Sequence, residues 1–155
     1  MSSADAVAQL TLDSFGYGRV ALIRATQLNT TGNAVIAIPF LGGGLTAGGA
    51  VANSGGVIVR RITIQNPSGS VSSANIAISV QSNGNIAAAN AVVANVVLST
   101  ITSAGMYQDL TIAGAYGANT AVSGNTTQAL YLNVNTASGN NNTVDIAVFG
   151  EVVSF

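Results

Sequence analysis

The sequence predicts an all-β fold, a sandwich or barrel of eight short strands, and three observations support this. Apolar and polar residues alternate with a period of two over most of the chain, as they do in half-buried strands. Clusters of Gly, Asn, Ser and Pro separate the alternating segments and are typical of turns. No long helical pattern appears between them. At 155 residues the chain is the size of one ordinary domain.

The first segment, Met1–Ser14, is small and polar, and only Ala4–Leu10 is weakly helical. Because short helices without packing partners are marginal in water, we expect an N-terminal arm over residues 1–14 and the domain over residues 15–155. The arm has neither a basic region nor an apolar run, so it does not read as a secretory signal, and we expect an unexported, soluble chain.

The first strand is expected over Tyr17–Leu28, where Val20 and Leu22 alternate with their neighbours. A turn at Thr30-Thr31-Gly32-Asn33 leads into the second strand, Asn33–Leu41. Pro39 has no N–H to donate, which predicts that this strand lies at a sheet edge or contains a bulge. A loop rich in Gly and Ala follows up to Gly56.

The third strand is expected over Val57–Asn66 and ends in the strong turn sequence Asn66-Pro67-Ser68-Gly69. The fourth is Ile76–Val80. Simple alternation along the third strand predicts Ile58, Arg60, Ile62 and Ile64 on one face and Val57, Val59, Arg61 and Thr63 on the other.

The stretch Ala87–Val97 fits a buried strand or a buried helix by periodicity alone. We favour a short helical or irregular start and then a fifth strand over Val93–Thr102, because the β-branched residues gather there. The sixth strand is Met106–Ala113, and a loop is expected over Gly114–Thr126.

The last two strands have the clearest pattern. The seventh begins at Thr127, and after a Gly/Asn/Ser turn the eighth covers Thr143–Val153. Asp145 and Glu151 lie on the face of the eighth strand opposite Val144, Ile146 and Val148, which indicates that Ile146 is core. We therefore expect Ile146→Ala to cost about 2 to 5 kcal/mol. We expect Asp145→Ala to be close to neutral, because both acids read as solvated surface charges.

The composition is unusual in its lack of charge. Hydrophobic residues make up 48% of the chain and charged residues only 6%, against about 25% in average soluble proteins. A folded monomer of this size would expose about 7,000 Å². Ser, Thr, Asn and Gly must solvate that surface, and a surface so neutral resists self-association poorly. The composition therefore predicts that partners cover much of it.

The same composition excludes several functions. Four Arg and no Lys cannot supply a nucleic-acid surface, so no nucleic-acid partner is expected. The most apolar run, Ile86–Leu98, is interrupted by Asn90 and Asn95 and is shorter than the ~20 residues of a membrane helix, so no membrane partner is expected. Without Cys there is no disulfide framework or thiolate zinc site.

No catalytic chemistry is expected either. The chain lacks His and Cys, so no Ser-His or Cys-His nucleophile can form. Asp145 and Glu151 are separated by about 20 Å of strand, too far for a glycosidase pair. The Gly42–Gly56 loop has neither the Lys of a phosphate-binding loop nor the third glycine of a dinucleotide motif, because Ala47 stands there. We predict no enzyme activity, no cofactor and no metal.

The candidate interface residues come from two groups. Arginine without lysine suits interfaces, because the guanidinium makes bidentate bonds and is weakly hydrated, although four exposed charges that only keep the chain soluble would look the same. The arm offers apolar side chains for docking. The candidates are Val7, Leu10, Leu12, Arg19, Arg24, Arg60 and Arg61.

A resemblance rests on Met106-Tyr107-Gln108-Asp109-Leu110-Thr111-Ile112, on Leu130-Tyr131-Leu132-Asn133-Val134 and on the run from Val144 to Gly150. These segments resemble the closing strands of small jelly-roll head decoration, or cement, proteins of tailed bacteriophages. The likeness covers about the last third of the chain and its composition, and it carries no ligand motif. It implies a jelly roll on the outer surface of an icosahedral capsid, commonly a homotrimer, that clamps the shell of major capsid protein.

A jelly roll also fixes an expected strand order. Strand eight should lie beside strand one, with strands one, eight, three and six in one sheet and two, seven, four and five in the other. Other roles remain open: a tail or head-fibre subunit, a pilus-like or surface-layer subunit, a small-virus coat protein, or a carbohydrate-binding jelly roll. The coat protein usually needs a basic arm, and residues 1–14 contain none. The carbohydrate module usually needs exposed aromatics, and the chain has four Tyr and no Trp.

Overall fold

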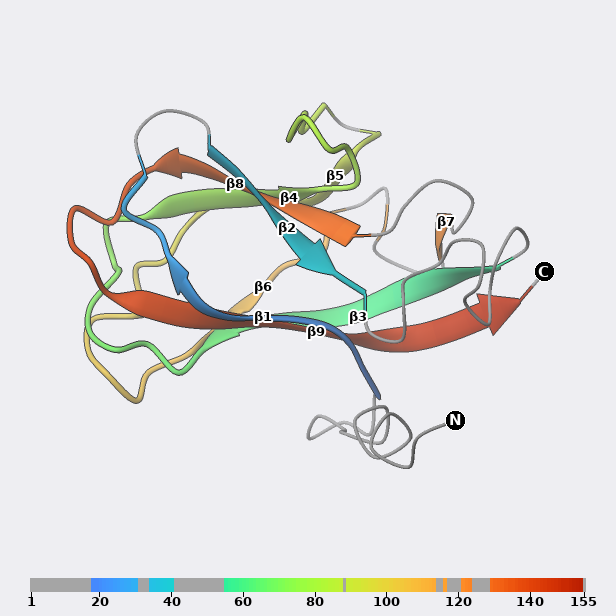
Figure 1. Ribbon diagram of the computed structural model, residues 1–155. Coiled ribbons are helices and arrows are strands. Elements are labelled where there is room, and N and C mark those ends of the chain that lie inside the picture. The colour runs from blue at the N-terminus through green and yellow to red at the C-terminus, as the bar shows by residue number, and fades with distance from the viewer. Residues whose placement is uncertain are drawn as a thin grey trace.

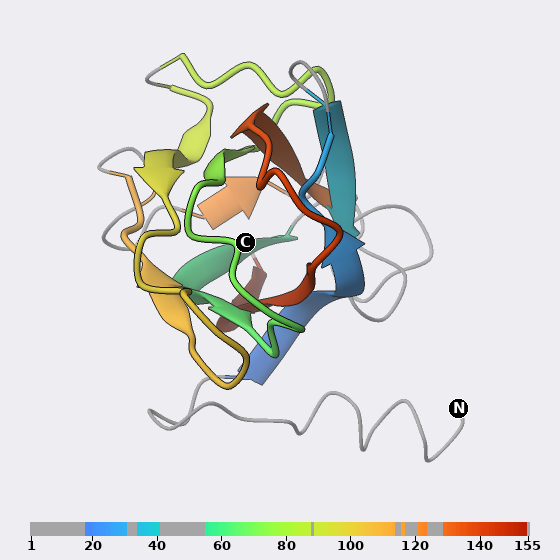
Figure 2. The same cartoon turned by 90° about the vertical axis from the view of Figure 1, so that its left-hand side faces the viewer.

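The fold contains two antiparallel β-sheets in face-to-face contact, seen from two directions in Figures 1 and 2. The computed structural model describes residues 18–30, 34–40, 55–87, 89–113, 116, 121–123 and 129–154. No helix occurs among these residues. The strands are β1 (Gly18–Gln27), β2 (Ala34–Pro39), β3 (Gly55–Gln65), β4 (Asn75–Ser79), β5 (Ala91–Val97), β6 (Gln108–Leu110), β7 (Ala121–Ser123), β8 (Ala129–Thr136) and β9 (Thr143–Ser154).

The strand order confirms the predicted pairing. One sheet has the order β1-β9-β3-β6, with β7 also paired to β3, and the other has the order β2-β8-β4-β5. The predicted seventh and eighth strands are β8 and β9, and they lie in different sheets although they are consecutive in the chain. Strand β9 lies between the first strand and the third, with Ile146 opposite both Ile23 and Ile64.

The core lies between the sheets and consists of the residues that the period-two pattern selects. Ile146 is fully buried, as predicted, and Val144 and Val148 flank it on the same face of β9. The facing sheet contributes residues from β4 and β8. The largest fully buried side chains include Ile62, Ile64, Ile76, Ile78, Leu130, Leu132 and Ile146.

Both sides of the sandwich are closed by contacts between the two sheets, and Figure 2 shows β1 and β2 on one side and β5 and β6 on the other. Ala21 of β1 forms a bridge with Phe40, directly after β2. On the opposite side the N–H of Ala113 donates to the carbonyl of Val92 in β5 at 2.7 Å. Strand β2 is at the end of its sheet, which confirms the edge position predicted from Pro39.

Three of the sequence expectations are wrong in detail. The predicted count of eight strands omits β7, which lies within the expected loop Gly114–Thr126 and pairs with β3. The fifth strand ends at Val97 rather than Thr102. It begins at Ala91 rather than at Val93, after the irregular start that was one of the expected alternatives: a turn in which the N–H groups of Asn90 and Ala91 both donate to the carbonyl of Ala87.

The predicted faces of β3 are also wrong, and the cause is a bulge. The register between β3 and β9 shifts between Val59 and Arg61, so Arg60 is the inserted residue. One inserted residue reverses the alternation. Val57 and Val59 before the bulge therefore join Ile62 and Ile64 after it in the core. A second bulge in β1, between Arg19 and Ala21, likewise places Ala21 in the core.

Gly150 of β9 lies between these two bulges, opposite Gly18 of β1 and Val59 of β3. A Cβ atom at this position would lie 2.1 Å from the carbonyl oxygen of Ile58. The close approach of the β3 backbone thus requires glycine here. In the part of the chain that the structure describes, no helix is long and apolar enough to cross a membrane.

Candidate interaction surface

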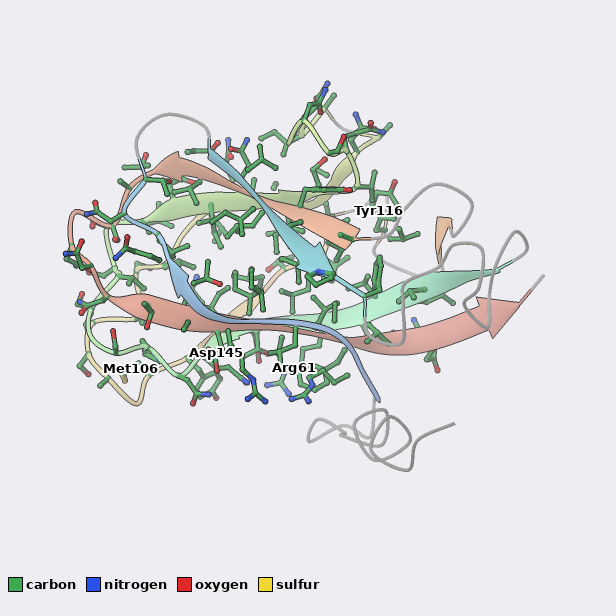
Figure 3. All side chains as sticks on the ribbon, in the orientation of Figure 1. Arg61, Met106, Tyr116 and Asp145 are labelled. Atoms are coloured by element: carbon green, nitrogen blue, oxygen red, sulfur yellow. The ribbon has the colours of Figure 1, made fainter. Side chains whose placement is uncertain are left out.

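The charged residues of the described chain are concentrated on one sheet. All seven belong to strands of the five-stranded sheet: β1, β3, β6 and β9. Figure 3 shows Arg61 and Asp145 projecting from the side of this sheet that faces away from the core. We call this surface the charged face. It includes Arg19, Arg24, Arg60, Arg61, Thr63, Asp109, Asp145, Ala147, Phe149 and Glu151.

The centre of the charged face is apolar. Phe149 is opposite Arg19 on one side and Arg61 on the other, so an arginine from each neighbouring strand lies beside the ring position. Ala147 occupies the next position on the same face, between Leu22 and Thr63. Ala147 is fully buried and Phe149 is 7% exposed. The chain itself therefore already covers the apolar side chains at the centre of the charged face.

Two arginines form ion pairs across strands. Arg60 contacts Glu151, with Nη2 2.7 Å and Nε 3.0 Å from Oε2. Arg61 makes a bidentate contact with Asp109, with Nε to Oδ1 and Nη2 to Oδ2 both at 2.9 Å. All four side chains keep 20 to 47% of their surface exposed, so each pair contributes only about 0 to 1 kcal/mol. Their main effect is to fix the positions of the guanidinium groups.

Asp109 of β6 also accepts a hydrogen bond from the hydroxyl of Thr63, at 2.6 Å. Burial opposes ionisation of this carboxyl and would raise its pKa. The hydrogen bonds from Arg61 and Thr63 and the positive charge of Arg61 outweigh burial, so the pKa of Asp109 lies below its usual value. Asp109 is therefore ionised at neutral pH.

Asp145 connects three strands at the opposite end of the same face. Its Oδ1 accepts the backbone N–H of Ala25 in β1 at 2.8 Å, and its Oδ2 accepts the side-chain amide of Asn66 after β3 at 2.9 Å. These two residues are the non-glycine residues with positive φ in the described part of the chain, at 49° and 48°. The expectation that Asp145 is only a solvated charge is wrong, because the carboxylate accepts the N–H of Ala25 at a strained backbone position and the side-chain amide of Asn66.

The other two arginines differ in their surroundings. Arg19 and Arg24, both in β1, form no ion pair within the described residues, and the Nε of Arg19 is buried without a hydrogen-bond partner there. Arg24 is exposed and belongs with Ala25 to a bulge opposite Asp145. The oxygens of Asp145 are already engaged by Ala25 and Asn66. Strand β1 thus presents donors that still lack acceptors.

The outer surface of the four-stranded sheet contains no charged residue among those described. The connection between β4 and β5 covers part of it. The hydroxyl of Ser79 donates to the carbonyl of Asn85 at 2.5 Å, and the amide of Asn133 donates to the carbonyl of Gly84 at 3.3 Å. As a result Ser79 and Asn133 are buried although they lie on the outer side of their strands. The two outer surfaces of the sandwich therefore differ sharply in charge.

A third feature lies at the end of the sandwich, where the segment between β5 and β6 exposes large apolar side chains. Tyr107 is 62% exposed, Val97 46% and Met106 42%, and Figure 3 shows Met106 at this end. The buried side chains of Leu98 and Ile101 anchor the segment. Its exposed residues belong to a fixed loop, which suits recognition.

The sequence selected Arg19, Arg24, Arg60 and Arg61, and the structure brings all four to one sheet, in β1 and β3. Val7, Leu10 and Leu12, the other candidates, lie outside the described residues, as do residues 42–54 of the glycine-rich loop. Sequence reasoning missed Phe149 and Ala147 as the centre of the face. Phe149 stands one residue before Gly150. A glycine inside a strand often marks a bulge or a close approach of another backbone, so this aromatic-glycine pair was the available signal in the sequence.

Within the described residues no group of three or more His, Cys, Asp or Glu side chains could hold a metal ion. The charged face is suited to protein contacts, because ion pairs and hydrogen bonds hold several of its charges in place. Comparison of the chain with protein-family models, with curated proteins and with solved structures finds no match.

Proposed function

We propose that this chain is a structural virion protein, a jelly-roll head decoration or cement protein that binds the assembled head of a tailed bacteriophage and stabilises it through protein contacts. It acts on the outer surface of the capsid as an oligomer, a homotrimer by resemblance, with the major capsid protein as its second partner. The role involves no catalysis, cofactor or metal.

The observation that carries this proposal is the division of charge between the two outer surfaces. A chain with 6% charged residues places every described charge on one sheet and leaves the other sheet neutral. A neutral surface favours contact with similar neutral surfaces, and a charged surface favours a partner of complementary charge. Two such surfaces on opposite sides of one domain suit a subunit that contacts other copies of itself through one surface and the shell through the other.

The strand order supports the fold assignment. The sheets have the strand orders β1-β9-β3-β6 and β2-β8-β4-β5. If the short β7 is left out and the remaining strands are numbered one to eight, these orders become 1-8-3-6 and 2-7-4-5, as expected of a jelly roll. Each copy that binds only to the assembled shell stabilises the shell by mass action. A small domain without catalytic groups is sufficient for that task.

Co-sedimentation with capsids tests the proposal. Purified protein is mixed with assembled heads that lack it, and the same protein is mixed with unassembled major capsid protein. The proposal predicts saturable binding to the assembled heads and none to the free subunits. Failure to pellet with heads, together with binding to tails or fibres, would instead support the tail-fibre or head-fibre alternative.

One observation favours a second function, the carbohydrate-binding module. Tyr107 is the most exposed of the large hydrophobic side chains among the described residues, and sugar-binding modules stack sugars on exposed aromatic rings. A glycan array separates the two functions. Binding that Tyr107→Ala abolishes would support the module, while an intact protein that binds no glycan on the array leaves the decoration role.

A further inference from the structure

We propose that the unmatched arginines of β1, Arg19 and Arg24, form the docking site for the acidic N-terminal segment, residues 1–17, of a second copy of this chain. This inference rests on the proposed self-association and names the contact that would produce it. The occupant is the segment that carries Asp5 and Asp13.

The distribution of charge is the first argument. The described residues contain four arginines and three carboxylates, a balance of +1, whereas the whole chain has a net charge of −1. Asp5 and Asp13, which precede the described residues, account for the difference. The N-terminal segment is therefore acidic and the folded domain slightly basic. The segment thus carries two carboxylates, and two arginines of the described chain form no ion pair there.

The state of the arginines is the second argument. Asp109 and Glu151 are bonded to Arg61 and Arg60, and both oxygens of Asp145 already accept hydrogen bonds. None of these three carboxylates forms an ion pair with Arg19 or Arg24. A buried donor without an acceptor, such as the Nε of Arg19, costs free energy. A carboxylate supplies the acceptor that a guanidinium binds most strongly.

Reach and direction favour a second copy over the same chain. Seventeen extended residues span about 56 Å, whereas the radius of gyration of a domain of this size is about 15 Å. The segment enters β1 at Gly18, next to Arg19, so docking on its own strand would require a reversal just before Gly18. A segment that comes from a neighbouring copy is not tied to Gly18 of the strand on which it docks. Val7, Leu10 and Leu12 add apolar side chains to the two carboxylates of this segment.

Charge exchange between two full-length variants tests the proposal. In the acidic-face variant, Arg19→Asp is combined with Arg24→Asp; in the basic-arm variant, Asp5→Arg is combined with Asp13→Arg. Light scattering gives the mass of each alone and of their mixture at micromolar concentration. Unfolding midpoints verify that both are folded, and Glu151→Gln, which removes a charge of the same face, is the matched control.

The proposal predicts that each variant alone loses association at least tenfold and that their mixture forms mixed pairs, in which each arm meets a face of opposite charge. The Glu151→Gln control should associate as the original chain does. If the mixture stays monomeric and a chain with all four changes recovers the behaviour of the original, the segment docks on its own domain and the proposal is wrong. If both variants associate like the original chain, self-association stands but uses another surface, and the proposed contact is wrong.

If the original chain is a monomer, both this contact and the oligomeric part of the proposed function are wrong. Capsid binding is a separate property, and the co-sedimentation experiment tests it. If Arg19→Asp prevents folding, the test is repeated with single substitutions. Arg24→Asp is then mixed with Asp5→Arg in one experiment and with Asp13→Arg in another.

Discussion

The carboxylate of Asp145 accepts the backbone N–H of Ala25 at 2.8 Å, although the two residues are 120 positions apart in the chain. Ala25 has a φ of 49°, and L-residues other than Gly, Asn and Asp rarely adopt that conformation. The same carboxylate bonds Asn66, with a φ of 48°. One side chain on the central strand β9 therefore stabilises irregular backbone in both neighbouring strands.

We expect Asp145→Ala to destabilise the fold by about 1 to 2 kcal/mol, because two hydrogen bonds to an ionised acceptor are lost at a partly exposed site. The control is Glu151→Ala, which removes an exposed ion-pair partner and should cost less than about 1 kcal/mol. Urea unfolding midpoints of the two variants measure the difference. Equal midpoints would show that Asp145 does not hold the two backbone positions.

Gly150→Ala should be the most disruptive single-methyl change in the described chain. The added Cβ would lie 2.1 Å from a backbone oxygen, so β3 or β9 must shift, at a cost of about 3 kcal/mol or more. Gly139→Ala is the matched control: nothing lies within 4 Å of its Cβ position, and its φ of +75° costs only about 1 to 2 kcal/mol. Thermal denaturation of both proteins provides the comparison. A smaller loss for Gly150→Ala than for Gly139→Ala would contradict the close packing of the two backbones.

Ile146→Ala should cost about 2 to 5 kcal/mol, because the side chain is fully buried between the sheets and its loss leaves a cavity. Val97→Ala removes an apolar side chain that is 46% exposed and should change stability by no more than about 0.5 kcal/mol. Guanidinium denaturation measures both. A similar cost at the two positions would mean that β9 does not present Ile146 to the core.

Asp109 predicts a pH dependence whose sign follows from its lowered pKa. A carboxyl that is more acidic in the folded chain than in the unfolded chain, where its pKa is about 3.9, stabilises the fold above that pH. The contribution falls as the pH drops through the folded pKa. In unfolding experiments from pH 7 to pH 2, the stability advantage of the original chain over Asp109→Asn should shrink toward acid. An advantage that grows toward acid would reverse the assignment.

Much of the fold could be predicted because its strands alternate regularly. The pattern of Leu130, Leu132 and Val134 in β8 and of Val144, Ile146 and Val148 in β9 identified the core faces directly. The pattern failed at Arg60, since a single inserted residue reverses the faces of a strand, and nothing in β3 itself marks the insertion. The signal lies in the partner strand, at Gly150.

The candidate surface was predictable only in part. The type and number of the arginines indicated an interface, but their gathering on one sheet depends on the β1-β9-β3 pairing and on two bulges. The role of Asp145 depends on contacts 120 and 79 residues away in the chain. Local patterns describe residues a few positions apart, so they could not distinguish this structural carboxylate from the solvated charge that we expected.

The proposed stabilisation of an assembled shell can be measured as a change in the rupture temperature of phage heads. Heads with and without the bound protein are heated, and release of their DNA is followed by dye fluorescence. We expect added protein to raise the rupture temperature in a concentration-dependent way up to saturation, as linkage requires of a ligand specific for the intact shell. An unchanged rupture temperature at concentrations where the protein demonstrably coats the heads would contradict it.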